Sequence, residues 1–538
     1  MSLLRSRAVG AGALFVIAAV LAVVPAAACA DEAEPLYKTN AVAVVDLTLS
    51  PAARSALEAE PDEYVEAGFE LGIDDDGVPG GHVTELTASP LTVGLRLKGS
   101  VLGSFRPLSG KAALKVKFAA FVKKQKFRGL KKLTLNNMVE DPSMIHEALT
   151  YTVFRQLGIP APRTGYAFVR LNGEPYGVYM DIEDVDDVAL KRIFGSFDEK
   201  SQHLYEGENG ADVVPGGAGA FEVDEGEEAN RSDLEALIAA VNGPSPASFA
   251  ARLAPVADLA EMTRFWAIEK YIGRWDGYAG ADKGANQPNN YLLYSNSAGV
   301  FQMLPWGSDE TWEQRLAFDG HDGLMFNLCL EDPACAAPYW EALHGARSAI
   351  AALPLDALAT ELAALLAPWQ AEDPRKEQSQ AQIEAAVAGV RQFIASRPAE
   401  ADAWLAAHEP PPKGGDAGGG ASGGGSDPGG TAAPQDARPL RLAGVVKRPG
   451  ELRLRFRLLV PGRVRESVSV GTAAGRRRVC APAASAAAAT TLVLTCRLPR
   501  FVRQRLRRGP VRLRVVTEVE TASGVAVTAT RRVTLPRQ

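Results

Sequence analysis

The sequence predicts an α+β protein followed by a glycine-rich linker and an all-β, immunoglobulin-like sandwich. Three observations support this fold class. Helical and strand periodicities are mixed up to residue 408, proline and glycine dominate the next stretch, and short alternating segments fill the rest. We therefore expect four parts: a signal peptide over residues 1–30, an α+β domain over 31–408, the linker over 409–437 and the sandwich over 438–538.

In the first half of the α+β domain, six stretches between residues 40 and 230 have the composition of strands: AVAVVDLTL, LTVGLRLKG, AALKVKF, KKLTLNN, YAFVRLNG and PYGVYMDIE. One clear helix lies among them. It should begin at Asp141, whose side chain can cap it, with Pro142 in the first turn, and it should stop at Gly158. Residues 232–275 and 336–408 are alanine-rich with helical periodicity, so the second half should be mainly helical.

The last hundred residues are strongly basic. From Arg438 onward there are 22 arginines and one lysine against four glutamates, a net charge of +19, and since the whole chain carries −6, residues 1–437 carry −25. Leu, Val and Phe alternate with Arg, which places arginines on one face of a sandwich. An acidic envelope polymer or an anionic membrane would suit this face, although a solvated strand face explains it equally well. No aromatic residues are interleaved, so we expect no specific nucleic acid partner.

The N-terminus has the pattern of a secretory signal. Arg5 and Arg7 precede an uncharged apolar run, and PAAACADE follows it. Cleavage after Ala30 would release a secreted chain, whereas cleavage before Cys29 would leave a cysteine for lipid attachment. No other stretch is long and apolar enough to cross a membrane, so we expect no transmembrane span in the mature chain.

The remaining cysteines fall into two close pairs, Cys329 with Cys335 and Cys480 with Cys496. Neither pair is spaced like a zinc site, and in an oxidising compartment each can form a disulfide. Two pairs of buried thiols are the alternative.

A row of lysines marks the first candidate site. Lys115 and Lys117 alternate with apolar residues, so both should project from one face of a strand, and Lys98 and Lys111 lie nearby. Such a row could bind a polyphosphate, because each ammonium can meet a phosphate oxygen. The acidic run at 183–187 could hold one lysine by an ion pair. On spacing alone, a solvated face is the more common explanation.

Carboxylates beside tryptophans mark the second candidate site. Asp276 in GRWDGYAG and Asp309 in PWGSDETW flank NQPNNYLLY, which contains Asn290. Two aspartates and an asparagine are hard oxygen ligands that suit Mg²⁺ with substrate phosphates. Glu147, in the predicted helix, is explained equally well by favourable charge at a helix N-terminus. No Ser-His-Asp set, paired-histidine zinc motif or Walker loop is present, and DDDG (74–77) and DGHDG (319–323) read as loops.

A series of short motifs, in one order, resembles the CotH family of spore coat protein H-like atypical protein kinases. In chain order, the motifs are KKLTLNN, DPS, GIPAPRT, LNGEPYGVY, the acidic ExVD, WDGY, NNYLLY and LPWGSD. The resemblance covers about residues 40–400. The resemblance implies a divergent kinase-like CotH domain that binds ATP with Mg²⁺. It implies phosphorylation of serine or threonine on coat or cell-surface proteins and on the protein itself.

The resemblance also implies roles for individual residues. Lys98, Lys111, Lys117 and Glu147 would bind nucleotide, with Lys98 in the place of a family arginine. Asp276 and Asp309 would be the catalytic carboxylates, and Asn290 with Asp309 would hold the metal. Two departures weaken the match: His146 replaces an arginine in DPS-x-x-R-E, and Gly307 replaces the first aspartate of P-W-D-x-D.

The sequence therefore predicts a secreted or envelope-associated protein kinase with a protein substrate. A non-catalytic pseudokinase scaffold is the alternative that Gly307 favours. A third hypothesis is a carbohydrate-binding protein that uses exposed Trp and Tyr side chains between residues 271 and 312.

Overall fold

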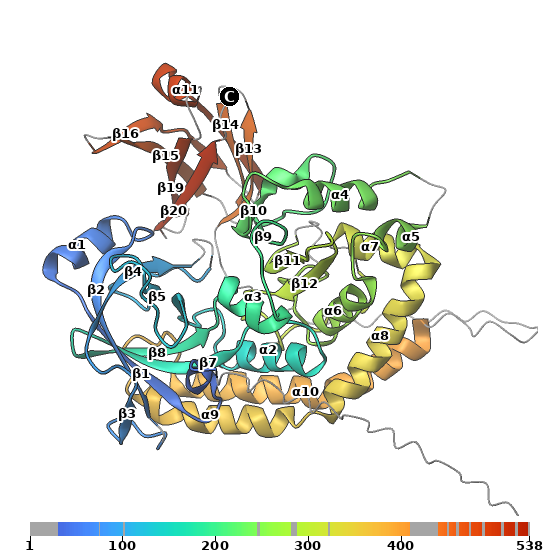
Figure 1. The fold of residues 1–538 in the computed structure, drawn as a ribbon, viewed down its shortest axis with the longest axis horizontal. Coiled ribbons are helices and arrows are strands. Elements are labelled where there is room, and N and C mark those ends of the chain that lie inside the picture. Colours follow the sequence, from blue (N-terminus) through green and yellow to red (C-terminus); the bar gives the residue numbers. More distant parts are fainter. Residues whose placement is uncertain are drawn as a thin grey trace, which may run out of the picture.

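The computed structural model confirms the mixed α+β character of the chain (Figure 1). It describes residues 31–408, except 75, 100–102, 245–247, 281–287 and 321–322, and residues 440–535, except 449–450, 459–461, 473–474, 487–489, 507–510 and 522–525. The predicted signal peptide with Cys29 and the predicted linker over 409–437 lie outside the described residues.

The first half of the domain is a sheet that closes on itself. Its elements are η1 (Glu34–Tyr37), β1 (Val42–Thr48), α1 (Pro51–Ala59), β2 (Val65–Asp74), β3 (Val83–Glu85), β4 (Leu91–Lys98), β5 (Ala113–Lys117), β6 (Lys132–Asn136), α2 (His146–Gln156), β7 (Thr164–Leu171) and β8 (Glu174–Ile182). The strand order is β1-β7-β8-β6-β5-β4-β2-β3, and β1 also pairs with β2, which closes the ring. All six predicted strands are present.

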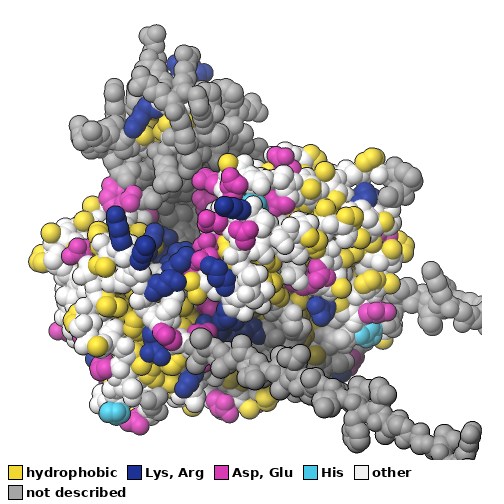
Figure 2. All heavy atoms as spheres, in the orientation of Figure 1, with side chains coloured by type: hydrophobic (Ala, Val, Ile, Leu, Met, Phe, Trp, Pro, Cys, Tyr) yellow, Lys and Arg dark blue, Asp and Glu magenta, His cyan; other side chains and the backbone are white. Residues whose placement is uncertain are grey.

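One hydrophobic core fills the inside of this ring. Every second residue of β4, β5 and β6 points into it, including Leu95, Leu114 and Leu133. The intervening residues point outward, and cross-strand pairing places Lys115 opposite Arg96 and Thr134, and Lys117 opposite Gly94 and Lys132. The predicted alternation is therefore confirmed. The outer face of β4, β5 and β6 is basic, and Lys and Arg gather beside Asp and Glu in the middle of the surface in Figure 2.

The second half combines helices with a small sheet. Its elements are α3 (Asp187–Phe194), β9 (His203–Gly207), η2 (Gly217–Ala220), β10 (Phe221–Glu225), α4 (Ser232–Val241), α5 (Phe249–Leu253), α6 (Leu259–Tyr271), β11 (Tyr291–Ser295), β12 (Phe301–Pro305), α7 (Leu324–Glu331), α8 (Pro333–Ala352), α9 (Leu355–Ala371) and α10 (Gln380–His408). The sheet order is β10-β9-β11-β12. A second core joins α2, α6 and α9 to the outer face of β1, β7 and β8.

The predicted start of α2 is wrong by five residues. The helix begins at His146, and its N-cap, Ile145, makes no side-chain cap. Met144 has a φ of 63°, which a right-handed helix cannot include, so the DPS segment forms a separate turn. Asp141 caps that turn instead, accepting hydrogen bonds from the backbone and hydroxyl of Ser143 and from the backbone N–H of His146.

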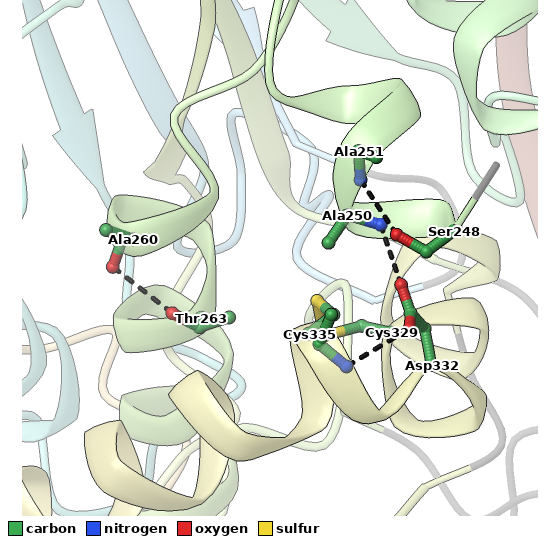
Figure 3. Close-up of a disulfide and its surroundings, with 9 residues drawn as sticks. Ser248, Ala250, Ala251, Ala260, Thr263, Cys329, Asp332 and Cys335 are labelled. Carbon is green, nitrogen blue, oxygen red and sulfur yellow. Dashed lines mark hydrogen bonds between the residues drawn. A yellow bond between two sulfur atoms is a disulfide. The ribbon is translucent and has the colours of Figure 1, made fainter.

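Both predicted disulfides are present. Cys329 at the end of α7 bonds Cys335 at the start of α8, and Asp332 between them caps α8 and accepts a 2.8 Å hydrogen bond from the backbone of Ala250 (Figure 3). Cys480 bonds Cys496 farther along the chain. The loop between α7 and α8 is therefore tied both to itself and to α5.

The C-terminal residues that the structure describes are mainly strands. They are β13 (Leu440–Arg448), β14 (Glu451–Leu458), β15 (Gly462–Thr472), β16 (Gly475–Cys480), β17 (Ala483–Ala486), β18 (Thr490–Arg497), β19 (Val511–Thr521) and β20 (Ala526–Leu535), with one helix, α11 (Arg500–Leu506). They pair as β13-β14-β18 and β16-β15-β19-β20, and β17 pairs with β15.

Within the described ranges, no single helix has the length and apolar composition of a membrane span. The bent pair of α8 and α9 meets the length and composition criteria only when its two helices are taken together.

Candidate functional site

Three predicted site residues from distant parts of the sequence interact electrostatically: Glu147 and Asp309 are buried, and Lys98 is half-buried. Lys98 ends β4, Glu147 lies in the first turn of α2, and Asp309 follows β12. Burial lowers the pKa of Lys98, and the nearby Glu147 and Asp309 act in the opposite direction. The structure thus places one lysine against two carboxylates, and we call these three residues the Lys98 cluster.

The negative charges of the two carboxylates in this cluster are only partly balanced by nearby positive charge. Burial, followed by the charge of Asp309, raises the pKa of Glu147 to about 8. Burial also raises the pKa of Asp309, although the charge of Lys98 lowers it in part. No direct ion pair joins Lys98 to either carboxylate among the residues that the structure describes. The cluster therefore has more negative than positive charge when both acids are ionised, which favours uptake of a cation.

Hydrogen bonds fix Glu147 and connect it to the segment that carries Asp309. The amide of Asn136, at the end of β6, donates to Glu147 Oε2 over 2.6 Å. The backbone N–H of Ser308 donates to Glu147 Oε1 over 3.3 Å. The hydroxyl of Tyr151 also donates to Glu147 Oε1 over 3.3 Å, so three neighbours hold this side chain. Glu147 also lies in the first turn of α2, as the helix N-terminus explanation expects.

His146 holds the backbone of Asp309. Its Nδ1 donates to the carbonyl oxygen of Asp309 over 2.6 Å, and its own backbone N–H donates to Asp141. The side chain is 4% exposed. The histidine that replaces the expected arginine therefore makes its polar contact with the segment that carries the candidate metal ligand.

A second group forms around Asp276. Its Oδ2 accepts hydrogen bonds from the amides of Asn289 over 3.0 Å and Asn290 over 2.8 Å. The sequence placed Asp276 and Asn290 in one site, and the structure brings their side chains together.

Arg274, which the sequence analysis missed, connects this group to the Lys98 cluster. It is 1% exposed and forms an ion pair with Glu269. Its guanidinium donates to Ser308 Oγ over 3.1 Å, to the carbonyl of Trp306 over 2.6 Å and to the carbonyl of Asn290. One buried cation therefore fixes the segments that carry Asp276, Asn290 and Asp309. Glu269 directly after the apolar residues 265–268 was the available signal, because buried acids need partners.

Gly307 is adapted to Asn290. Its φ is +54°, and a Cβ added there would lie 2.8 Å from Asn290 Oδ1 and 2.9 Å from Asn290 Cγ. The asparagine amide thus fills the space that a side chain at 307 would enter. In this chain, an aspartate at 307 requires Asn290 to move.

The structure does not bring Lys111 and Lys117 into the Lys98 cluster. The ammonium of Lys111 forms a buried 2.6 Å ion pair with Asp373, so it is occupied by a structural contact. Lys117 is exposed, lies over the ring of Tyr64, and sits opposite Gly94, four residues or about 13 Å along the strand from Lys98. The predicted ion pair from the acidic run is present, because Asp184 meets Lys115 at 2.7 Å.

Carboxylates on the second sheet face these lysines. Desolvation, followed by the charge of Asp224, raises the pKa of Glu206 on β9 to about 8, while Lys115 and Lys98 lower it. Desolvation and neighbouring acids also raise the pKa of Glu225 on β10 to about 7, against the charge of Lys132. The basic face of the ring and the acidic β9–β10 pair therefore border one another electrostatically.

The donor atoms fit only some metals. Within the described ranges, no three His, Cys, Asp or Glu side chains come together to hold a metal ion. Asp276, Asn290 and Asp309 offer oxygen donors with two carboxylates. That set suits Mg²⁺ bound together with phosphates, because Mg²⁺ takes one or two protein carboxylates and keeps substrate and water oxygens. It does not suit Zn²⁺ in a closed structural site.

The carbohydrate-binding hypothesis is wrong in its premise. It required exposed Trp and Tyr rings between residues 271 and 312. None of these rings, all of which the structure describes, is exposed: Trp306 is half-buried, and the others are buried, namely Tyr271, Trp275, Tyr278, Tyr291, Tyr294 and Trp312. These rings form the core that supports the site.

Fold and site together define a mixed α+β protein with a buried lysine–carboxylate cluster beside an asparagine–aspartate group. The family model described as CotH kinase protein matches residues 95–400, and the chain belongs to the CotH family. The match includes every candidate residue of the site.

Two curated proteins of Bacillus subtilis (strain 168) are similar to this chain. Inner spore coat protein H is 26% identical over 247 residues, which are 44% of this chain and 63% of that protein. Inner spore coat protein H-like protein is 33% identical over 109 residues, 20% of this chain and 34% of that protein. The chain thus spans less than two thirds of the length of either relative.

Proposed function

We propose that the protein is an atypical protein kinase that transfers phosphate from ATP to serine or threonine of coat or cell-surface proteins, including itself. The observation that carries the proposal is the convergence of Lys98, Glu147 and Asp309. A lysine held near a helix glutamate, with metal-binding carboxylates close by, is what phosphoryl transfer requires from a protein.

Each residue of the site has a separate proposed role. Lys98 contacts phosphate oxygens, and the charge of Glu147 favours its protonated form. Asn136 and Ser308 help to hold Glu147 in place. Asp309 and Asn290 would hold Mg²⁺, which neutralises phosphate charge when bound. Lys117, on the exposed rim of the same sheet face, is left with at most a peripheral phosphate contact.

Asp276 is assigned to the acceptor. A carboxylate that orients the attacking hydroxyl must itself be held, and the amides of Asn289 and Asn290 hold its Oδ2. Because that orientation matters chiefly in the transition state, Asp276→Asn should reduce transfer more than ATP binding.

A pseudokinase scaffold is the second candidate, and Gly307 favours it. The glycine removes one carboxylate from the expected P-W-D-x-D pattern, and Asn290 occupies the space beside it. A scaffold of this kind would keep the fold for recognition of an envelope partner and would bind nucleotide weakly or not at all.

The proposed location is the cell envelope or a coat, after export directed by residues 1–30, with Cys29 as a candidate lipid anchor. Similarity to two proteins named for the inner spore coat supports a coat or envelope protein. We assign the strands after residue 440 to an immunoglobulin-like sandwich joined by the linker, with an acidic envelope polymer as the partner of its arginines.

Calorimetric titration of ATP with and without Mg²⁺, followed by autophosphorylation with labelled ATP, tests the proposal. We expect Mg²⁺-dependent binding and phosphate transfer, both lost in Asp309→Asn. ATP binding without transfer supports the scaffold, and absence of both rejects a nucleotide site.

A further inference from the structure

The turn between β5 and β6 presents apolar and cationic side chains together. Phe121 and Val122 are 47% and 42% exposed and are two of the four exposed large hydrophobic side chains among the described residues. Lys123, Lys124 and Lys126 follow and are exposed. None of these lysines forms an ion pair with a carboxylate in the part of the chain that the structure describes. We call residues 121–126 the lysine tip.

The shape of the lysine tip is fixed by the domain beneath it. The amide of Gln125 donates to the carbonyls of Thr92, over 2.8 Å, and Phe118, over 2.9 Å. Directly after the tip, the ring of Phe127 packs edge-on against Phe69 in the core of the ring of strands. The exposed side chains are therefore held in place before any partner arrives, so little ordering entropy opposes binding.

Lys124 has a backbone conformation that is unfavourable for a lysine. Its φ is 61°, in the left-handed region where glycine or asparagine costs less conformational energy. A lysine at this corner of the turn adds charge at a conformational cost. Strained non-glycine residues of this kind occur mainly at functional sites.

We propose that the lysine tip docks the protein on an anionic phospholipid bilayer. Phe121 and Val122 enter the headgroup region, and the lysines meet lipid phosphates. Two apolar side chains are far too few for a stable protein interface, which buries about 800 Å² per partner. A bilayer has no such minimum, because each lysine near an anionic surface adds its own contribution. A soluble polyanion would gain no binding free energy from contact with Phe121 and Val122.

A position-specific probe tests this docking. In the full chain with Cys29→Ser, the remaining native cysteines are bonded, so Val122→Cys adds one free thiol for an environment-sensitive fluorophore. Val78→Cys, at a valine that is 54% exposed, is the matched control. Vesicles of phosphatidylcholine with 30% phosphatidylglycerol, about a third anionic, should shift the emission at 122 and not at 78. Vesicles of phosphatidylcholine alone should shift neither, and equal responses at both positions would overturn the proposal.

Charge removal gives an independent measurement. Each lysine near an anionic surface strengthens binding about fivefold, so Lys123→Gln with Lys124→Gln should weaken vesicle binding by about 25-fold at low salt. The control removes two exposed lysines elsewhere, Lys38→Gln with Lys200→Gln, and should change binding less than about twofold. Comparing matched pairs cancels any binding by the arginine-rich C-terminal region. Equal losses of vesicle binding in both pairs would reject the lysine tip as the docking surface. A label at 122 that responds to polyglutamate but not to vesicles would also reject the bilayer, and it would indicate an acidic protein as the partner.

Discussion

Two buried lysine–carboxylate groups in the same domain differ in how well their charges are matched. Lys111 meets one carboxylate, Asp373, at 2.6 Å, and Asp373 also accepts from the backbone of Val178 and Arg375. Lys98 faces two carboxylates, and the pKa values of both are raised. The matched pair supports the structure, whereas the unmatched cluster has more carboxyl than ammonium groups, and a bound cation would favour the ionised form of its acids.

The matched pair should be the more sensitive to a change in one partner. Lys111→Met leaves Asp373 buried without its cation, and breaking a buried pair in this way costs about 3–5 kcal/mol. We expect a loss of that size in the free energy of unfolding, measured by urea denaturation. Lys117→Met, at the exposed end of β5, is the control and should change the free energy of unfolding by less than about 0.5 kcal/mol. A small loss of unfolding free energy in Lys111→Met would contradict the difference between the matched pair and the unmatched cluster.

The unmatched cluster should respond in the opposite way. Asp309→Asn keeps the shape and removes a buried charge that opposes Glu147, so stability should stay within about 0.5 kcal/mol or rise. Binding of ATP in the presence of Mg²⁺ should weaken by tenfold or more, about 1.4 kcal/mol, in calorimetric titration. A variant that loses stability as Lys111→Met does would identify Asp309 as a structural residue.

The pH dependence of stability should separate the two groups further. The pKa of Glu147 is about 8 in the folded protein and about 4.3 in an unfolded chain. Between these values the folded state binds more protons, so this group makes stability fall as pH rises, by up to about 1.4 kcal/mol per unit. Glu147→Gln cannot ionise and should flatten that part of the profile in metal-free buffer. Glu58→Gln, at an exposed glutamate, should leave the profile unchanged.

The sequence predicted which face of a strand a side chain occupies better than it predicted the side chain's interaction partner. The alternation in β5 correctly placed Lys115 and Lys117 on the outer face, because side chains alternate along any strand. It could not reveal that Lys111 is paired with Asp373, which lies 262 residues away. Only the closed ring of strands and the end of α9 bring those two side chains together.

Local backbone geometry explains the other failures. Asp141, Pro142 and Ser143 have the residue types of a helix start, but the left-handed Met144 separates them from α2. Gly307 looked like a simple loss of a carboxylate. Its fit against Asn290 depends on two loops folding together, which no spacing in the sequence reveals.

The close contact between Gly307 and Asn290 leads to the substitution with the smallest expected loss of stability. Gly307→Ala adds a Cβ at a φ of +54° beside the Asn290 amide and should cost about 1–2 kcal/mol in unfolding free energy. Part of that cost is contact and part is backbone strain. Asn290→Ala should therefore remove the contact part, and the double variant should be less destabilised than the sum of the single changes by about 0.5 kcal/mol or more.

The same coupling decides whether a carboxylate at 307 can help to bind metal. Gly307→Asp alone must displace Asn290, one of the two candidate metal ligands, so we expect no gain in Mg²⁺ affinity from this change. In the double variant Gly307→Asp with Asn290→Ala, the carboxylate has room, and Mg²⁺-dependent nucleotide binding should recover relative to Asn290→Ala, as measured by calorimetry. Tighter Mg²⁺ binding by Gly307→Asp alone would contradict the steric coupling. No recovery in the double variant would mean that this position does not face the metal, and it would favour the scaffold over the kinase.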